Sequence, residues 1–182
     1  MKKMILMGAL MTLLLVSSTL QATPVTSGLY MWFDAGGDVT KDGSNYVSSW
    51  NDESGKGNHA TPPNAQPLYV ASGINGLPVI RFSSGTGANT NLLQTSAGLM
   101  TLTDVSIFVA YQYTSTVVGN MLCGSASAIN GYGGSGNYII MDNQGTGTTN
   151  RARIQATSSY FDEVANGVKD TNPHMQSMVF DG

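Results

Sequence analysis

With 182 residues, the chain is long enough for one domain that buries about 70% of the surface exposed when it is unfolded, so its core needs no disulfide or metal. Charged residues make up 10% of the composition and hydrophobic residues 41%, which excludes the disordered and fibrous classes. The net charge is −3, and losing Lys2 and Lys3 with a leader would make it −5, which argues against nucleic-acid binding.

Residues 1–22 have the features of a secretory signal peptide. Two lysines precede an apolar run from Met4 to Val16, and Ser17 to Ala22 follows. The run is shorter than the roughly 20 residues that span a bilayer, so we favour a cleaved leader over an uncleaved anchor and leave the cleavage site open. Cys123 is the only cysteine, so no intramolecular disulfide forms, and we expect it to be a buried small hydrophobe.

After a short linker at residues 23–27, we expect one β domain over residues 28–182. Gly28–Asp34 alternates in a way that predicts a first strand with two apolar faces. Ala35–Asn45 is rich in glycine and aspartate and is predicted as a loop, and Tyr46–Asn51 as the next strand.

The following stretch is dominated by turn chemistry. In Asp52–Asn58, two glycines permit positive φ, while Asp and Asn side chains can bond nearby amides. Ala60–Pro67 contains three prolines, which confine it to an edge or loop, and Asn75-Gly76 indicates a tight turn. We expect Trp50, Val79 and Phe82 to contribute to the core.

The rest of the chain predicts further short strands, of which Val105–Tyr113 has the clearest alternation. Beyond the leader there is no apolar stripe of helical period. The sequence therefore predicts an all-β, antiparallel two-sheet β-sandwich or jelly roll. The other expected strands are Tyr69-Val70, Pro78–Ser83, Leu92-Leu93, Val117–Cys123, Tyr138–Met141, Arg151–Ala156 and Met175–Phe180.

The strand Met175–Phe180 is followed by Asp181-Gly182, a typical hairpin opener. A strand with this signal expects a partner after it, so we predict that the chain is a fragment or is truncated inside the domain. Expressed alone, it would then aggregate through the unpaired edge.

Four segments taken together carry a family resemblance: GLYMWFDA (28–35), VSSWNDESGKGNHA (47–60), INGLPVIRF (74–82) and NPHMQSMVFDG (172–182). They resemble the LamG-like jelly-roll domains of the concanavalin A-like lectin/glucanase superfamily, found in exported bacterial proteins. Residues 50–60 satisfy the pattern W-x-D-x-S-G-x-G-N-x-A. The first strand is bulkier here, and members continue past the last Asp-Gly. The resemblance implies a secreted or cell-envelope location and glycan or protein binding, sometimes with calcium.

Catalytic motifs are missing from the sequence. Glucanases of this superfamily place two glutamates on one strand, whereas Glu53 is predicted in a turn and Glu163 in a loop. Gly131–Gly136 satisfies G-x-G-x-x-G, but a strand is expected after it rather than a helix, so it is interpreted as a loop. There is no G-x-S-x-G elbow. His59 and His174 are isolated and are interpreted as structural histidines.

Two binding features stay open. Asp34, Asp38, Asp42 and Asp52 offer the hard oxygens that Ca²⁺ prefers, but ordinary Asx turns are the favoured interpretation. Tyr132, Tyr138 and Tyr160 lie near glycine-rich loops, where they could stack on sugar rings or pack in the sheet. The ligand-binding residues, the ligand and the oligomeric state are left unassigned.

The leading hypothesis is a secreted, non-catalytic β-sandwich module that binds carbohydrate or a cell-surface partner. One alternative is a polysaccharide hydrolase or lyase whose active residues lie in a missing C-terminal part. The other is a structural or adhesion repeat of a surface protein.

Overall fold

The computed structural model describes residues 27–83, 91–95, 104–115, 121–125, 138–142, 150–156, 159–165 and 170–181. The predicted leader at residues 1–22, the linker up to residue 26, and Gly131–Gly136 with Tyr132 lie outside this part of the chain. Among the described residues, no helix has the length and apolar character needed to cross a membrane.

The described residues confirm the all-β class: every strand pair is antiparallel, and the helical content is a single 3-10 turn, η1 (Ile74–Gly76). The strands are β1 (Val39–Lys41), β2 (Val47–Trp50), β3 (Leu68–Val70), β4 (Val79–Arg81), β5 (Asp104–Gln112), β6 (Met121–Ser125), β7 (Tyr138–Asp142), β8 (Asn150–Ala156), β9 (Ser159–Ala165) and β10 (Pro173–Asp181).

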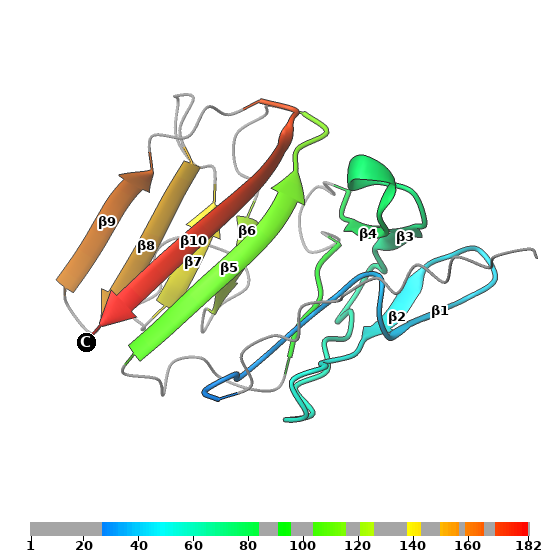
Figure 1. Cartoon of the computed structure of the whole chain (residues 1–182), viewed down its shortest axis with the longest axis horizontal. Coiled ribbons are helices and arrows are strands. Elements are labelled where there is room, and N and C mark those ends of the chain that lie inside the picture. The colour runs from blue at the N-terminus through cyan, green and yellow to red at the C-terminus, as the bar shows by residue number, and fades with distance from the viewer. Residues whose placement is uncertain are drawn as a thin grey trace, which may run out of the picture.

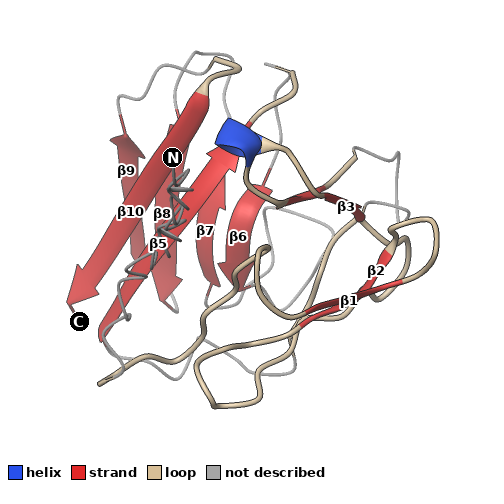
Figure 2. Cartoon of the chain, turned by 45° about the vertical axis from the view of Figure 1, so that its right-hand side comes forward, coloured by secondary structure: helices blue, strands red, loops and turns tan. Residues whose placement is uncertain are grey.

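These strands form small sheets. Three of them are two-stranded, β1–β2, β3–β4 and β10–β5, and the fourth has the order β6-β7-β8-β9. Figures 1 and 2 show β1 to β4 on one side of the molecule and β5 to β10 on the other. In Figure 1 the ribbons of β5 and β10 run in front of the four-stranded sheet.

The core of the first half is centred on β2. Val47 has no exposed surface, and its amide donates to the carbonyl oxygen of Pro67, which is also fully buried, at 2.8 Å. Trp50 and Ala60 exchange two backbone hydrogen bonds of 2.8 and 2.9 Å. The predicted extended segment Ala60–Pro67 therefore runs beside β2. This is an edge position, which is where prolines are tolerated in a sheet.

The prediction of a strand at Gly28–Asp34 is wrong, because no strand is assigned there, and β1 lies inside the predicted loop instead. The physical reason is that polar groups of residues 50–58 make hydrogen bonds to the backbone of this segment. The Trp32 amide donates to the Asp52 carboxylate, and the Trp32 carbonyl accepts from the Glu53 amide. The N–H and C=O groups of Trp32 are therefore already bonded and cannot pair with a neighbouring strand.

The Asn75-Gly76 turn is confirmed. Both residues have positive φ, 52° and 79°, and the Leu77 amide donates to the Ile74 carbonyl oxygen at 2.9 Å. This is the backbone geometry that favours Asn followed by Gly in a tight turn. The predicted core role of Phe82 is wrong, since its side chain is 46% exposed, while Val79 is half-buried.

The strand β10 pairs with β5 over its full nine residues without a register shift. Strand β5, which comes before β10 in the chain, bonds one edge of it. A partner after Gly182 stays a prediction, because the described residues do not test it. Side chains alternate as predicted: Tyr111, Tyr113 and Met178 are buried, whereas Phe108, Met175 and Val179 on the other face are 70%, 79% and 71% exposed.

Two further predictions need correction. Strand β9 was not expected, and it places Glu163 in a strand rather than a loop. Leu92 and Leu93 form no strand, although the next residue, Gln94, makes an isolated bridge to Thr61. Of the expected strand Val117–Cys123, the described part belongs to β6, and residues 117–120 lie outside the described ranges. The expected strand Arg151–Ala156 is confirmed as β8.

Because Val47 is fully buried, Val47→Ala should lower the free energy of unfolding by about 2 kcal/mol, from lost transfer energy and the cavity left behind. Val179→Ala is the matched control, since that side chain is 71% exposed, and should change stability by less than about 0.5 kcal/mol. Urea unfolding followed by tryptophan fluorescence measures both. Equal effects of the two substitutions would contradict this assignment of the core.

Candidate functional site

The Asp52 carboxylate is a buried group that accepts four hydrogen bonds. It is 7% exposed. Its Oδ1 accepts from the amides of Trp32 at 2.9 Å and Ser54 at 3.0 Å, and its Oδ2 accepts from the Ser54 hydroxyl at 2.8 Å and the Asn58 amide at 2.9 Å. The turn at residues 52–58 is thus wound around its own first side chain, as Asx turns are.

These hydrogen bonds decide the ionisation of Asp52. Burial alone would raise the pKa of the carboxyl group, but the amides of Trp32, Ser54 and Asn58 and the Ser54 hydroxyl all stabilise the anion and hold the pKa below its ordinary value of 3.8. The side chain is therefore charged at neutral pH, and its four acceptor positions are filled.

The same turn fixes the segment before β1. The Ser54 hydroxyl and the Asn58 side-chain amide reach the Tyr30 carbonyl oxygen at 3.2 and 2.9 Å, and the Trp50 indole N–H reaches the Asp34 carbonyl oxygen at 2.9 Å. The rings of Phe33 and Trp50 are 5.4 Å apart. The W-x-D-x-S-G-x-G-N pattern therefore supplies the donors that hold residues 30–34.

The other aspartates proposed for calcium also bond their own loops. Asp34 Oδ1 accepts from the Gly36 amide at 2.7 Å, and Asp42 Oδ1 accepts from the amides of Ser44 and Tyr46 at 2.8 and 2.9 Å. No group of three or more His, Cys, Asp or Glu side chains in the described ranges could hold a metal. The Asx-turn interpretation is confirmed for Asp34, Asp42 and Asp52, and calcium gains no support there.

Glu53 also has a structural contact. Its Oε1 accepts from the Asp38 amide at 3.2 Å, and the Asn51 amide donates to the Asp38 carbonyl oxygen at 3.0 Å. A Cβ at position 37 would lie 1.6 Å from Glu53 Oε1, so a larger residue there would push the end of the Glu53 side chain away from the Asp38 amide. The loop before β1 is clamped to residues 51–53 in this way.

The two histidines lie in different structural settings. His59 Nδ1 accepts from the Asp52 amide at 3.1 Å, which makes it part of the Asp52 turn. His174 Nε2 contacts Asp170 Oδ1 at 2.7 Å, and its ring stacks on Tyr111 with centroids 5.5 Å apart. Burial raises the pKa of Tyr111, and the Asn172 amide and His174 lower the pKa of the half-buried Asp170. The sequence did not predict this Asp170–His174 pair.

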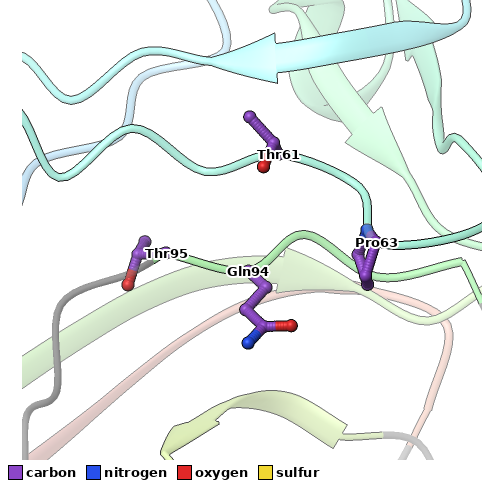
Figure 3. Close-up of a pocket in the computed structure, with 4 residues that line it drawn as sticks. All are labelled: Thr61, Pro63, Gln94 and Thr95. Carbon is purple, nitrogen blue, oxygen red and sulfur yellow. The ribbon is translucent and has the colours of Figure 1, made fainter.

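A shallow, open depression of about 230 Å³ lies where residues 61–63 meet residues 94–95, and Figure 3 shows the four residues that line it: Thr61, Pro63, Gln94 and Thr95. Thr61 and Gln94 exchange two backbone hydrogen bonds of 2.9 Å, which fix the two segments together. No motif marks this place, because the bridge joins segments far apart in sequence. None of these four described lining residues is a predicted site residue.

Two of the three tyrosines proposed for sugar stacking lie in strands. Tyr138 begins β7 and Tyr160 lies in β9, so both belong to strands, while Tyr132 is outside the described residues. Comparison of the chain with protein-family models, with curated proteins and with solved structures gives no match.

Replacing Asp52 by Asn should cost about 2 kcal/mol of unfolding free energy, because the new amide N–H₂ would face the donating Asn58 amide and leave a buried donor unpaired. Asp42→Asn is the control: both amides bonded to Asp42 reach Oδ1, which asparagine retains, so the change should stay within about 0.5 kcal/mol. Chemical denaturation at neutral pH compares them. An Asp52→Asn variant with the same unfolding free energy as wild type would refute the role given to Oδ2.

The lowered pKa of Asp52 also predicts an acid dependence. A carboxyl group whose pKa is depressed by folding contributes stability that is complete above the ordinary value of 3.8 and is lost as the pH falls through the folded-state pKa. The stability gap between wild type and Asp52→Asn should therefore be largest at neutral pH and shrink below pH 3.8. Denaturation curves across this range measure it, and a gap that stays constant or widens in acid would contradict the assignment.

Proposed function

We propose that this chain is a non-catalytic binding module that is exported through its N-terminal leader and binds a carbohydrate or a cell-surface partner. The observation that carries the proposal is the depression between residues 61–63 and 94–95. Among the described residues, its lining consists of two threonines, a glutamine and a proline, and none of these four is charged.

This set of side chains suits sugar hydroxyl groups. The hydroxyl of Thr61 and the amide of Gln94 each offer both a donor and an acceptor, which is what a neutral polyol presents in return. The exposed Pro63 ring adds an apolar contact for the C–H face of a sugar. A charged ligand would find no counter-charge among these four residues.

The depression is also rigid enough to serve as a site. Prolines at positions 62, 63 and 67 restrict the backbone of the first segment, and the Thr61–Gln94 bridge holds the second. The adjacent Ala60 is anchored to Trp50 by two backbone hydrogen bonds. A site ordered before binding loses less conformational entropy when a ligand arrives.

The proposal extends to the fold and family. We infer a two-sheet jelly roll of the LamG-like, concanavalin A-like type, supported by the antiparallel pairing, by the W-x-D-x-S-G-x-G-N-x-A pattern at residues 50–60, and by the position of β5 and β10 in front of the four-stranded sheet (Figure 1). In such an arrangement the depression would lie at the border between β2 and the strands that follow.

A glycan array probed with the purified chain tests the proposal, and we expect retention on at least one class of neutral polysaccharide. Gln94→Ala should weaken that binding about tenfold, because it removes one or two hydrogen bonds to the ligand. Thr40→Ala, at an exposed threonine of β1, should bind like wild type. Binding unaffected by Gln94→Ala would place the site elsewhere, and the absence of binding to glycans and to cell-surface preparations would refute the proposal.

A further inference from the structure

We propose that Asn91 is a positioning residue for the depression between residues 61–63 and 94–95. Its side chain fixes one wall of the depression against the other and so sets the affinity for the ligand. The inference rests on the proposed function, because it concerns the same depression. Asn91 is not among the four described residues that line it, so its effect on binding is indirect.

Asn91 uses both ends of its side-chain amide to hold other segments. Its Nδ2 donates to the Gln66 carbonyl oxygen at 2.6 Å, and its Oδ1 accepts from the Ser83 hydroxyl at 2.5 Å. An amide suits this task, because it offers a donor and an acceptor on one group. The side chain therefore joins the segment that leads into β3 to the segment that leaves β4.

The two partners of Asn91 lie at the open end of the β3–β4 hairpin. In the ladder, Leu68 pairs with Arg81. Gln66 and Ser83 are the next positions on the same face of either strand, but the strands themselves end before them. Asn91 bonds both residues at this end of the ladder. The chain that follows Asn91 is thereby attached to the hairpin.

This attachment fixes the position of the second wall of the depression (Figure 3). Gln94 comes shortly after Asn91 and exchanges two backbone hydrogen bonds of 2.9 Å with Thr61, as an isolated bridge outside any strand. Asn91 adds a second attachment, to Gln66, on the same proline-containing segment that carries Thr61 and Pro63. Walls that are joined at two points keep their separation.

The separation of the walls matters for affinity. Pairing between two short extended segments is marginally stable in water by itself. Without Asn91, the Thr61–Gln94 bridge should therefore open for a large fraction of the time. A ligand that contacts both walls then binds to only part of the population, and its apparent affinity falls in proportion.

Amide hydrogen exchange of the ligand-free chain tests the positioning role directly. In Asn91→Ala, the Thr61 and Gln94 amides should exchange about tenfold faster than in wild type, because two hydrogen bonds that hold the walls are lost. The Trp32 amide, which is bonded to Asp52, should be unchanged, which separates local opening from loss of the fold. Unchanged exchange at Thr61 and Gln94, or equally faster exchange at Trp32, would overturn the proposal.

Conservative substitutions test the two bonds one at a time. Ser83→Ala removes one bond and should speed exchange at Thr61 and Gln94 about threefold, whereas Ser83→Thr keeps the hydroxyl and should match wild type. Asn91→Asp keeps the acceptor for Ser83 but turns an oxygen toward the Gln66 carbonyl, so it should behave like Asn91→Ala. Exchange in Ser83→Thr as fast as in Ser83→Ala, or wild-type exchange in Asn91→Asp, would contradict the proposal.

Affinity electrophoresis in gels that contain dextran or hydroxyethyl cellulose, two neutral polysaccharides, measures the effect on binding. Asn91→Ala should bind about fivefold more weakly than wild type. Asn172→Ala is the matched control: it removes an asparagine side-chain bond to Asp170, before β10, and should bind like wild type. Wild-type binding by Asn91→Ala would overturn the proposal. A wild type retarded in neither gel would overturn the claim about affinity, whereas the exchange results test the position of the walls independently of any ligand.

Discussion

The Asp52 carboxylate is the constraint on which the first half of the molecule depends. It is buried, ionised at neutral pH, and bonded to the amides of three residues that lie up to 20 positions away. A buried anion is tolerated only when its acceptor positions are filled. The turn at 52–58 and the segment at 30–34 therefore form together, because each supplies donors that the charge requires.

The two halves of the described chain are stabilised in different ways. In residues 27–83 the strands are short, and side chains bonded to backbone groups do much of the work: Trp50, Ser54 and Asn58 hold carbonyl oxygens of the segment 30–34. From β5 onward, longer strands pair through regular ladders. This contrast explains why a single carboxylate matters so much in the first half.

The sequence predicted what depends on neighbouring residues. The turns at 52–58 and at Asn75-Gly76 follow from glycine and Asx chemistry, and the alternation at Val105–Tyr113 predicts β5. Prediction from the sequence failed where residues distant in the chain determine the local structure. The 28–34 segment has strand-like alternation, yet its backbone is taken by residues of the 52–58 turn. Strand β9 was missed because Asp162-Glu163 interrupts any apolar alternation. The Thr61–Gln94 depression arises from a non-local bridge that leaves no local pattern.

The distinctive run from Trp50 to Ala60 therefore explains the fold of the N-terminal half, and the proposed ligand contacts begin at the residue after it. Amide hydrogen exchange at Trp32 tests this account most directly, because Trp32 lies outside any strand and its amide bonds to the Asp52 carboxylate at 2.9 Å. We predict that at neutral pH it exchanges as slowly as the amide of Val47, which lies in β2. Exchange at the rate of an unstructured peptide would contradict the central role of Asp52.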